Sequence, residues 1–157
     1  MTISVSRQRE IAVPHDFAFS FISDYRNIPL WMYGISAIEP LGGRARGVGA
    51  CFRAVFAGGA GATELELEAI RWQDGHLIAL SSVRGPEVAA RFQVAAVTES
   101  TTLVRVEIEV PAPGGLAGVA LRTVTNAVAG RAIRHTEANL RRELEARYAG
   151  RQAPEEI

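Results

Sequence analysis

The 157-residue sequence predicts a single α+β domain, in which a seven-stranded antiparallel sheet wraps around one long C-terminal helix. Three observations predict this fold. An alternating segment at the N-terminus is followed by two short helical segments, and six further alternating segments follow, joined by short turns. The last segment, Gly115 to Ala149, contains no proline and is rich in Ala, Leu, Arg and Glu. A sheet with one apolar face must be covered, and this helix is the available cover.

The first strand is predicted over residues 2–13, because its apolar residues share one parity: Ile3, Val5, Ile11 and Val13. Arg7 and Arg9 fall on the same parity, and an unpaired charge is costly in a dry interior. In one interpretation, this end of the strand overhangs the helix, or a bulge turns both side chains outward. In the other, one arginine contacts an anionic or carbonyl group of a ligand.

Two short helices are predicted next, and they are expected to close one end of the sheet. Pro14 ends the first strand, and residues 14–22 form the first helix. Asp24 is the expected N-cap of the second helix, and Pro29 can begin a further turn. Trp31, Met32 and Tyr33 then lie where the short helices meet the second strand. They form either an aromatic lip at a cavity mouth or ordinary hydrophobic closure of the barrel end.

The remaining six strands are expected near residues 35–39, 48–57, 63–72, 77–83, 88–94 and 104–110. Phe52, Phe56 and Phe92 fall on their apolar faces, so each belongs either to the core or to a cavity wall. The inner face of the 77–83 strand is not assigned, because both parities carry apolar residues.

Several segments resemble the polyketide cyclase/dehydrase-like branch of the START/Bet v 1-like (SRPBCC) superfamily. These are Ile-Ala-Val-Pro at 11–14, Phe19, Asp-Tyr-Arg-Asn-Ile-Pro-Leu-Trp at 24–31, and Gly-Val-Gly at 47–49. The resemblance covers about residues 3–149. It implies the helix-grip fold, with a cavity between sheet and helix for apolar or amphipathic molecules. Residues 24–29 are also similar to the coenzyme Q-binding branch.

The long helix divides into two halves on a helical wheel. Its second half carries a stripe that can grip the sheet, formed by Ala129, Ile133, Thr136, Leu140 and Leu144. In its first half, the same stripe continues through Arg122 and Asn126. If the helix is straight, these two side chains face the pocket, whereas a kink near Gly130 would instead turn Leu121, Val124 and Val128 inward. We favour the straight helix, because an isolated glycine is tolerated within helices.

Composition argues against several classes of function. Lys plus Arg (17) balances Asp plus Glu (17), so we expect no nucleic-acid partner. The single Cys51 excludes an internal disulfide, and the lack of a Cys/His cluster argues against a structural metal site. His15, His76 and His135 are scattered and are typical of surface residues. With no signal-like or membrane-spanning apolar run, we expect a cytoplasmic protein without stable membrane insertion.

The predicted function is therefore the binding of a hydrophobic or amphipathic small molecule, polyketide-like or lipid-like, without a cofactor. The expected ligand contacts are Arg9, Trp31, Tyr33, Phe52, Phe56, Phe92, Arg122 and Asn126. One alternative is a cofactor-independent cyclase/dehydrase-type enzyme, whose catalytic residues we do not assign because no inward His, Asp or Glu is evident. A second alternative is a coenzyme Q-binding-like lipid carrier. We expect one domain over residues 1–150, a short disordered tail at 151–157, and a monomer or a homodimer.

Overall fold

The computed structural model describes residues 2–59, 61–111 and 115–152, with only the backbone described at 58, 59, 115–128 and 152. Its elements are β1 (Thr2–Ile11), α1 (His15–Ile22), the 3-10 helix η1 (Tyr25–Asn27), α2 (Ile28–Trp31), β2 (Ile35–Leu41), β3 (Cys51–Gly59), β4 (Gly61–Gln73), β5 (Leu77–Arg84), β6 (Ala89–Thr98), β7 (Thr101–Pro111) and α3 (Gly115–Gln152). This order matches the prediction, with boundaries that differ by a few residues.

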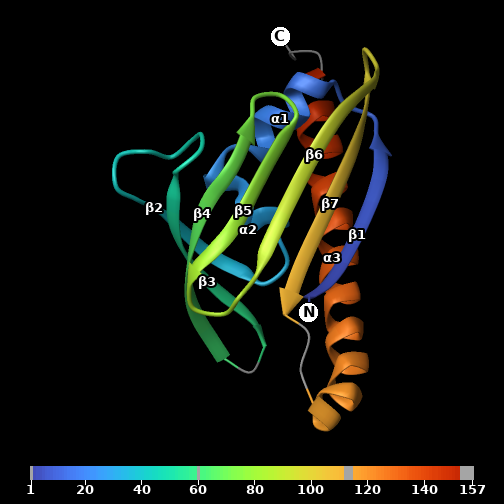
Figure 1. Cartoon of the computed structure of the whole chain (residues 1–157). Coiled ribbons are helices and arrows are strands. Elements are labelled where there is room, and N and C mark those ends of the chain that lie inside the picture. The colour runs from blue at the N-terminus through green and yellow to red at the C-terminus, as the bar shows by residue number, and fades with distance from the viewer. Residues whose placement is uncertain (1, 60, 112–114, 153–157) are drawn as a thin grey trace.

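All seven strands form one antiparallel sheet in the order β1-β7-β6-β5-β4-β3-β2. The sheet curves around α3, while α1 and α2 lie on the same face, with α1 near one end of the strands (Figure 1). Helix α3 packs against β1, β7, α1 and α2. The predicted helix-grip fold is confirmed.

The strands have one apolar and one charged face, as their alternation predicts. On β3 and β4, Phe52, Leu65 and Leu67 are buried on the inner face. The outer face carries cross-strand ion pairs, such as Arg53 Nη1 to Glu39 Oε1 at 3.0 Å. Exposed pairs of this kind contribute at most about 1 kcal/mol each. The inner face therefore provides most of the stability of the sheet.

The structure shows which residues of β5 face the core, a point that the sequence left unassigned. Ile78 and Leu80 join the core, yet Leu77 and Ala79 are also almost completely buried. In the sheet register, Leu77 and Ala79 lie between long polar side chains of the neighbouring strands: Gln73 and Arg71 on β4, and Gln93 and Arg91 on β6. The aliphatic stems of such side chains can cover small apolar residues on an outer face. Both parities of β5 are buried for this reason.

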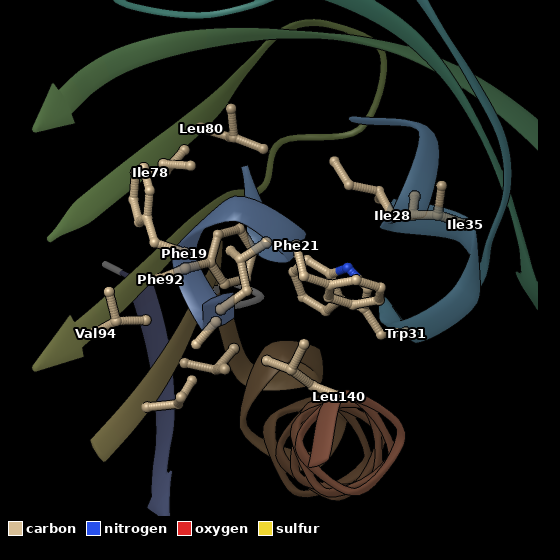
Figure 2. Close-up of a cluster of buried hydrophobic side chains, with 14 of the residues drawn as sticks. Phe19, Phe21, Ile28, Trp31, Ile35, Ile78, Leu80, Phe92, Val94 and Leu140 are labelled. Atoms are coloured by element: carbon tan, nitrogen blue, oxygen red, sulfur yellow. The ribbon is translucent and has the colours of Figure 1, made fainter. Parts of the chain in front are cut away.

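The short helices fill one end of the curved sheet with large apolar side chains. Figure 2 shows Phe19 and Phe21 of α1 and Trp31 of α2 packed between the strands and Leu140 of α3. Asp24 caps η1 as predicted, because its Oδ1 accepts a 3.0 Å hydrogen bond from the backbone N–H of Arg26.

Helix α3 grips the sheet through its second half. The predicted stripe is buried, with relative exposures of 7% or less at all five positions: Ala129, Ile133, Thr136, Leu140 and Leu144. The helix passes Gly130 without interruption, and its first turns extend past the ends of β1 and β7 (Figure 1). It also passes Gly150, so Arg151 and Gln152 belong to the helix, and residues 153–157 lie outside the described part of the chain.

Candidate functional site

An apolar cavity lies between the sheet and α3, at the end away from α1. Its volume is about 290 Å³, close to the lower limit of about 300 Å³ for small-molecule sites in proteins. The lining side chains come from the α2–β2 connection, the inner faces of the six strands β2 to β7, the β5–β6 loop and α3. They are Met32, Tyr33, Ile35, Phe56, Leu65, Leu67, Leu80, Pro86, Glu87, Val88, Ala90, Ile108, Val110, Ala129 and Ala132.

The wall of the cavity is almost entirely hydrocarbon. Among the described lining residues, only Tyr33 and Glu87 have polar side-chain groups. Hydrophobic transfer favours an apolar ligand body by roughly 25 cal/mol per Å² of buried apolar surface. The described wall therefore suits an apolar molecule.

Tyr33 and Phe56 are positioned together by the turn that follows α2. Gly34 has φ +81°, and a Cβ atom there would collide with the Phe56 ring. The backbone N–H of Tyr33 donates a 3.0 Å hydrogen bond to Thr136 Oγ1 on α3, which ties the turn to the helix. The Tyr33 ring lies between Phe56 and His135, with centroid distances of 6.5 and 5.6 Å.

The β5–β6 loop borders the cavity through Pro86, Glu87 and Val88, and it is fixed at both ends. Gly85 has φ +83°, and a Cβ atom there would lie 2.7 Å from the Glu64 carbonyl oxygen. At the other end, the Ser82 backbone N–H donates to the Val88 carbonyl, and the Val88 N–H donates to Ser82 Oγ, both at 2.9 Å. Glu87 therefore projects from a well-supported loop.

Three of the predicted ligand contacts lie in the core, outside the described cavity lining. Trp31 is 1% exposed and packs edge-on against Phe92 at a centroid distance of 5.0 Å. Phe52 packs against Tyr25 at 5.7 Å. Trp31 Nε1 is buried without a hydrogen-bond partner in the described part of the chain, an arrangement that costs stability in a dry core.

Of the other five predicted contacts, two line the cavity, two have side chains outside the described residues, and Arg9 lies against Glu137 of α3. Tyr33 and Phe56 line the cavity, so the structure brings together two of the eight predicted residues there. The Arg122 and Asn126 side chains lie outside the described residues, so their inward direction stays a prediction. The ligand-binding role of all eight residues also stays a prediction.

Arg9 and Arg7 meet a partner that the sequence reasoning missed. Both approach the Glu137 carboxylate on α3, and Arg7 Nε lies 3.8 Å from Glu137 Oε2. The β1–β7 register runs without a shift through both arginines, so no bulge turns them outward. The available sequence signal was an acidic residue beside the buried helix stripe, opposite a strand with two inward-facing arginines.

None of the three histidines is among the described residues that line the cavity. His15 Nε2–H donates to the Gly75 carbonyl, while His76 and His135 are exposed. In the part of the chain that the structure describes, no three His, Cys, Asp or Glu residues are arranged to hold a metal ion. Within the same residues, no helix is both long enough and apolar enough to cross a membrane.

A curved sheet around a C-terminal helix, with an apolar cavity between them, defines the START-like class of helix-grip proteins. The chain belongs to the family described as polyketide cyclase / dehydrase and lipid transport, whose model matches residues 2–145. The comparison with curated proteins gave no significant match.

Solved structures of the same class superimpose on nearly the whole chain. The Zhui aromatase/cyclase from Streptomyces sp. R1128 is 15% identical, with a TM-score of 0.77 over 94% of this chain and 96% of that one. A START superfamily protein from Mycobacterium smegmatis is 18% identical, with a TM-score of 0.74 over 91% and 97%. A protein from Thermus thermophilus is 15% identical, with a TM-score of 0.76 over 92% and 98%. At these identities, the similarity shows the fold alone.

Proposed function

We propose that this protein binds a hydrophobic or amphipathic small molecule, polyketide-like or lipid-like, in the cavity between the sheet and α3. The observation that carries the proposal is the hydrocarbon wall, in which only Tyr33 and Glu87 are polar among the described lining residues. A volume of about 290 Å³ corresponds to about ten water-sized groups at ~30 Å³ each. The bound part of the ligand is therefore small.

The wall favours binding over catalysis. Folding and dehydrating a polyketide-like chain needs groups that polarise carbonyls or transfer protons. The described wall contains no His, Lys or Asp, and its two polar side chains, Tyr33 and Glu87, come from the α2–β2 connection and the β5–β6 loop. A cofactor-independent cyclase/dehydrase remains the alternative function, with Tyr33 as the proton-transferring group nearest the apolar wall. A coenzyme Q-like carrier would use the same wall, but its ligand would extend beyond this volume.

Native mass spectrometry of protein purified from its own host, followed by extraction of the bound compound, tests the proposal. We expect a small, largely apolar metabolite bound in a 1:1 complex. The variant Ala90→Phe places a ring in the cavity and should lose the metabolite. The matched control Ala95→Phe changes an exposed residue of the same strand, on the other face, and should retain it.

Two results would contradict the proposal. One is an empty wild-type protein that also fails to bind small apolar probes. The other is retention of the metabolite by Ala90→Phe, because the ligand would then occupy another part of the molecule. Turnover of a polyketide-like substrate by the wild type, lost in Tyr33→Phe, would instead support the enzymatic alternative.

A further inference from the structure

The cavity has an uneven distribution of charge. Glu87, in the β5–β6 loop, is the one described lining residue that carries a formal charge. Its side chain is exposed, so the carboxylate keeps contact with water. The described part of the cavity therefore combines an apolar interior with a negative charge at its rim.

The Glu87 carboxylate is available to a ligand. In the described part of the chain, no ion pair or hydrogen bond is formed with it. The two arginines nearest to it in sequence are engaged elsewhere: Arg84 Nε lies 3.7 Å from Glu66 Oε2, and Arg91 Nη1 lies 4.0 Å from Glu107 Oε1. Neither neutralises the charge at the rim by direct contact.

The loop also holds the backbone of Glu87 in place before a ligand arrives. Pro86 directly precedes Glu87, and the proline ring restricts the φ angle of Pro86. Val88 follows it and is joined to Ser82 by two hydrogen bonds of 2.9 Å. Close packing of Gly85 against the β4 backbone secures the start of the loop. A supported loop loses little conformational entropy when a ligand binds, which favours affinity.

We propose that the cavity selects amphipathic molecules that carry a cationic head group, which Glu87 recognises at the rim while the apolar body fills the interior. This inference rests on the proposed function and adds the chemical class of the ligand. A carboxylate head group would meet the Glu87 charge and is disfavoured.

Three probes with the same eight-carbon body test the selection: 1-octylamine, 1-octanol and octanoate, each titrated by calorimetry at pH 7 and low salt. The amine is protonated and the acid is ionised at this pH. We expect octylamine to bind about fivefold more tightly than octanol, since ~1 kcal/mol acts between unit charges about 4 Å apart in water. Octanoate should bind more weakly than octanol.

The variant Glu87→Gln should remove the difference in affinity between octylamine and octanol. Glu99→Gln is the matched control, because it removes the same charge from an exposed turn between β6 and β7 and should preserve the preference. If octanol binds but the preference is absent, reversed or unaffected by Glu87→Gln, the inference is overturned and the proposed function stands. If none of the three probes binds, the proposed function fails as well.

Discussion

The ion-pair contact between β1 and α3 predicts unequal losses of stability when its acidic and its basic residues are replaced. Glu137 is almost buried, with a side-chain exposure of 7%, whereas Arg7 and Arg9 are 40% and 39% exposed. Glu137 Oε1 receives no hydrogen bond of regular geometry in the described part of the chain, so charge attraction dominates the contact. Removing the acid and removing the arginines should therefore have very different effects on the free energy of unfolding.

The double substitution Arg7→Gln/Arg9→Gln leaves the Glu137 carboxylate buried without a compensating charge. Breaking a buried ion pair in this way costs about 3–5 kcal/mol. The substitution Glu137→Gln instead leaves two arginines that water can reach, and the expected loss is about 1 kcal/mol. Glutamine keeps most of the aliphatic stem in every case, so lost packing contributes little.

Urea denaturation of the purified variants measures the difference. We expect a gap of at least ~2 kcal/mol between the arginine variant and Glu137→Gln, equivalent to roughly 4–8 °C in Tm for a domain of this size. Arg53→Gln, which removes an exposed pair with Glu39, should change stability by less than about 0.5 kcal/mol. Equal losses in the two variants, or a larger loss in Glu137→Gln, would refute the reasoning.

Two further predictions concern the turn and the cap that precede β2. Gly34→Ala should lower the free energy of unfolding by about 2–4 kcal/mol, because it combines a positive φ with a collision against Phe56. The control Gly42→Ala (φ +80°, no atom within 4 Å) should lower it by only about 1–2 kcal/mol. Equal losses of Tm in the two variants would contradict this prediction. The side chain and backbone N–H of Arg26 donate hydrogen bonds to Asp24, and this pairing lowers the pKa of that carboxyl below its ordinary value of 3.8, although partial burial opposes the shift. The resulting stability is present above pH 3.8 and is lost as the pH falls through the folded-state pKa of Asp24. Asp24→Asn should therefore lower the free energy of unfolding by up to ~1 kcal/mol at pH 7 and by less at pH 3. Urea titrations that show the same loss at both pH values would exclude this prediction.

The alternation of residues was sufficient to predict the strands and the inner faces of all of them except β5, because a period of two is a local property of the chain. Thus Phe52, Phe56 and Phe92 all lie on the face predicted for them. The same pattern could not predict which of these rings borders empty space. Phe56 lines the cavity, while Phe92 meets Trp31 across the sheet–helix interface. That difference depends on how far the short helices reach along the strands.

The partner of Arg7 and Arg9 shows the same limit. Their inward parity was evident, and it correctly marked an unusual position on β1. Their pairing with Glu137 depends on the axial and rotational placement of α3 against β1, which no local pattern encodes. The rim position of Glu87 was missed for a related reason, since a loop residue has no periodicity from which a direction can be inferred.

By itself, the sequence determined the order of the elements, the faces of every strand except β5, the Asp24 cap and the buried stripe of α3. Each of these follows from residues within a few positions of one another in the chain. The tertiary structure alone decided where the space between sheet and helix is filled and where a cavity remains. It also decided that Glu137 pairs with Arg7 and Arg9 and that Glu87 lies at the rim of the cavity. These features arise from contacts between residues far apart in sequence, and the relative placement of packed elements fixes them.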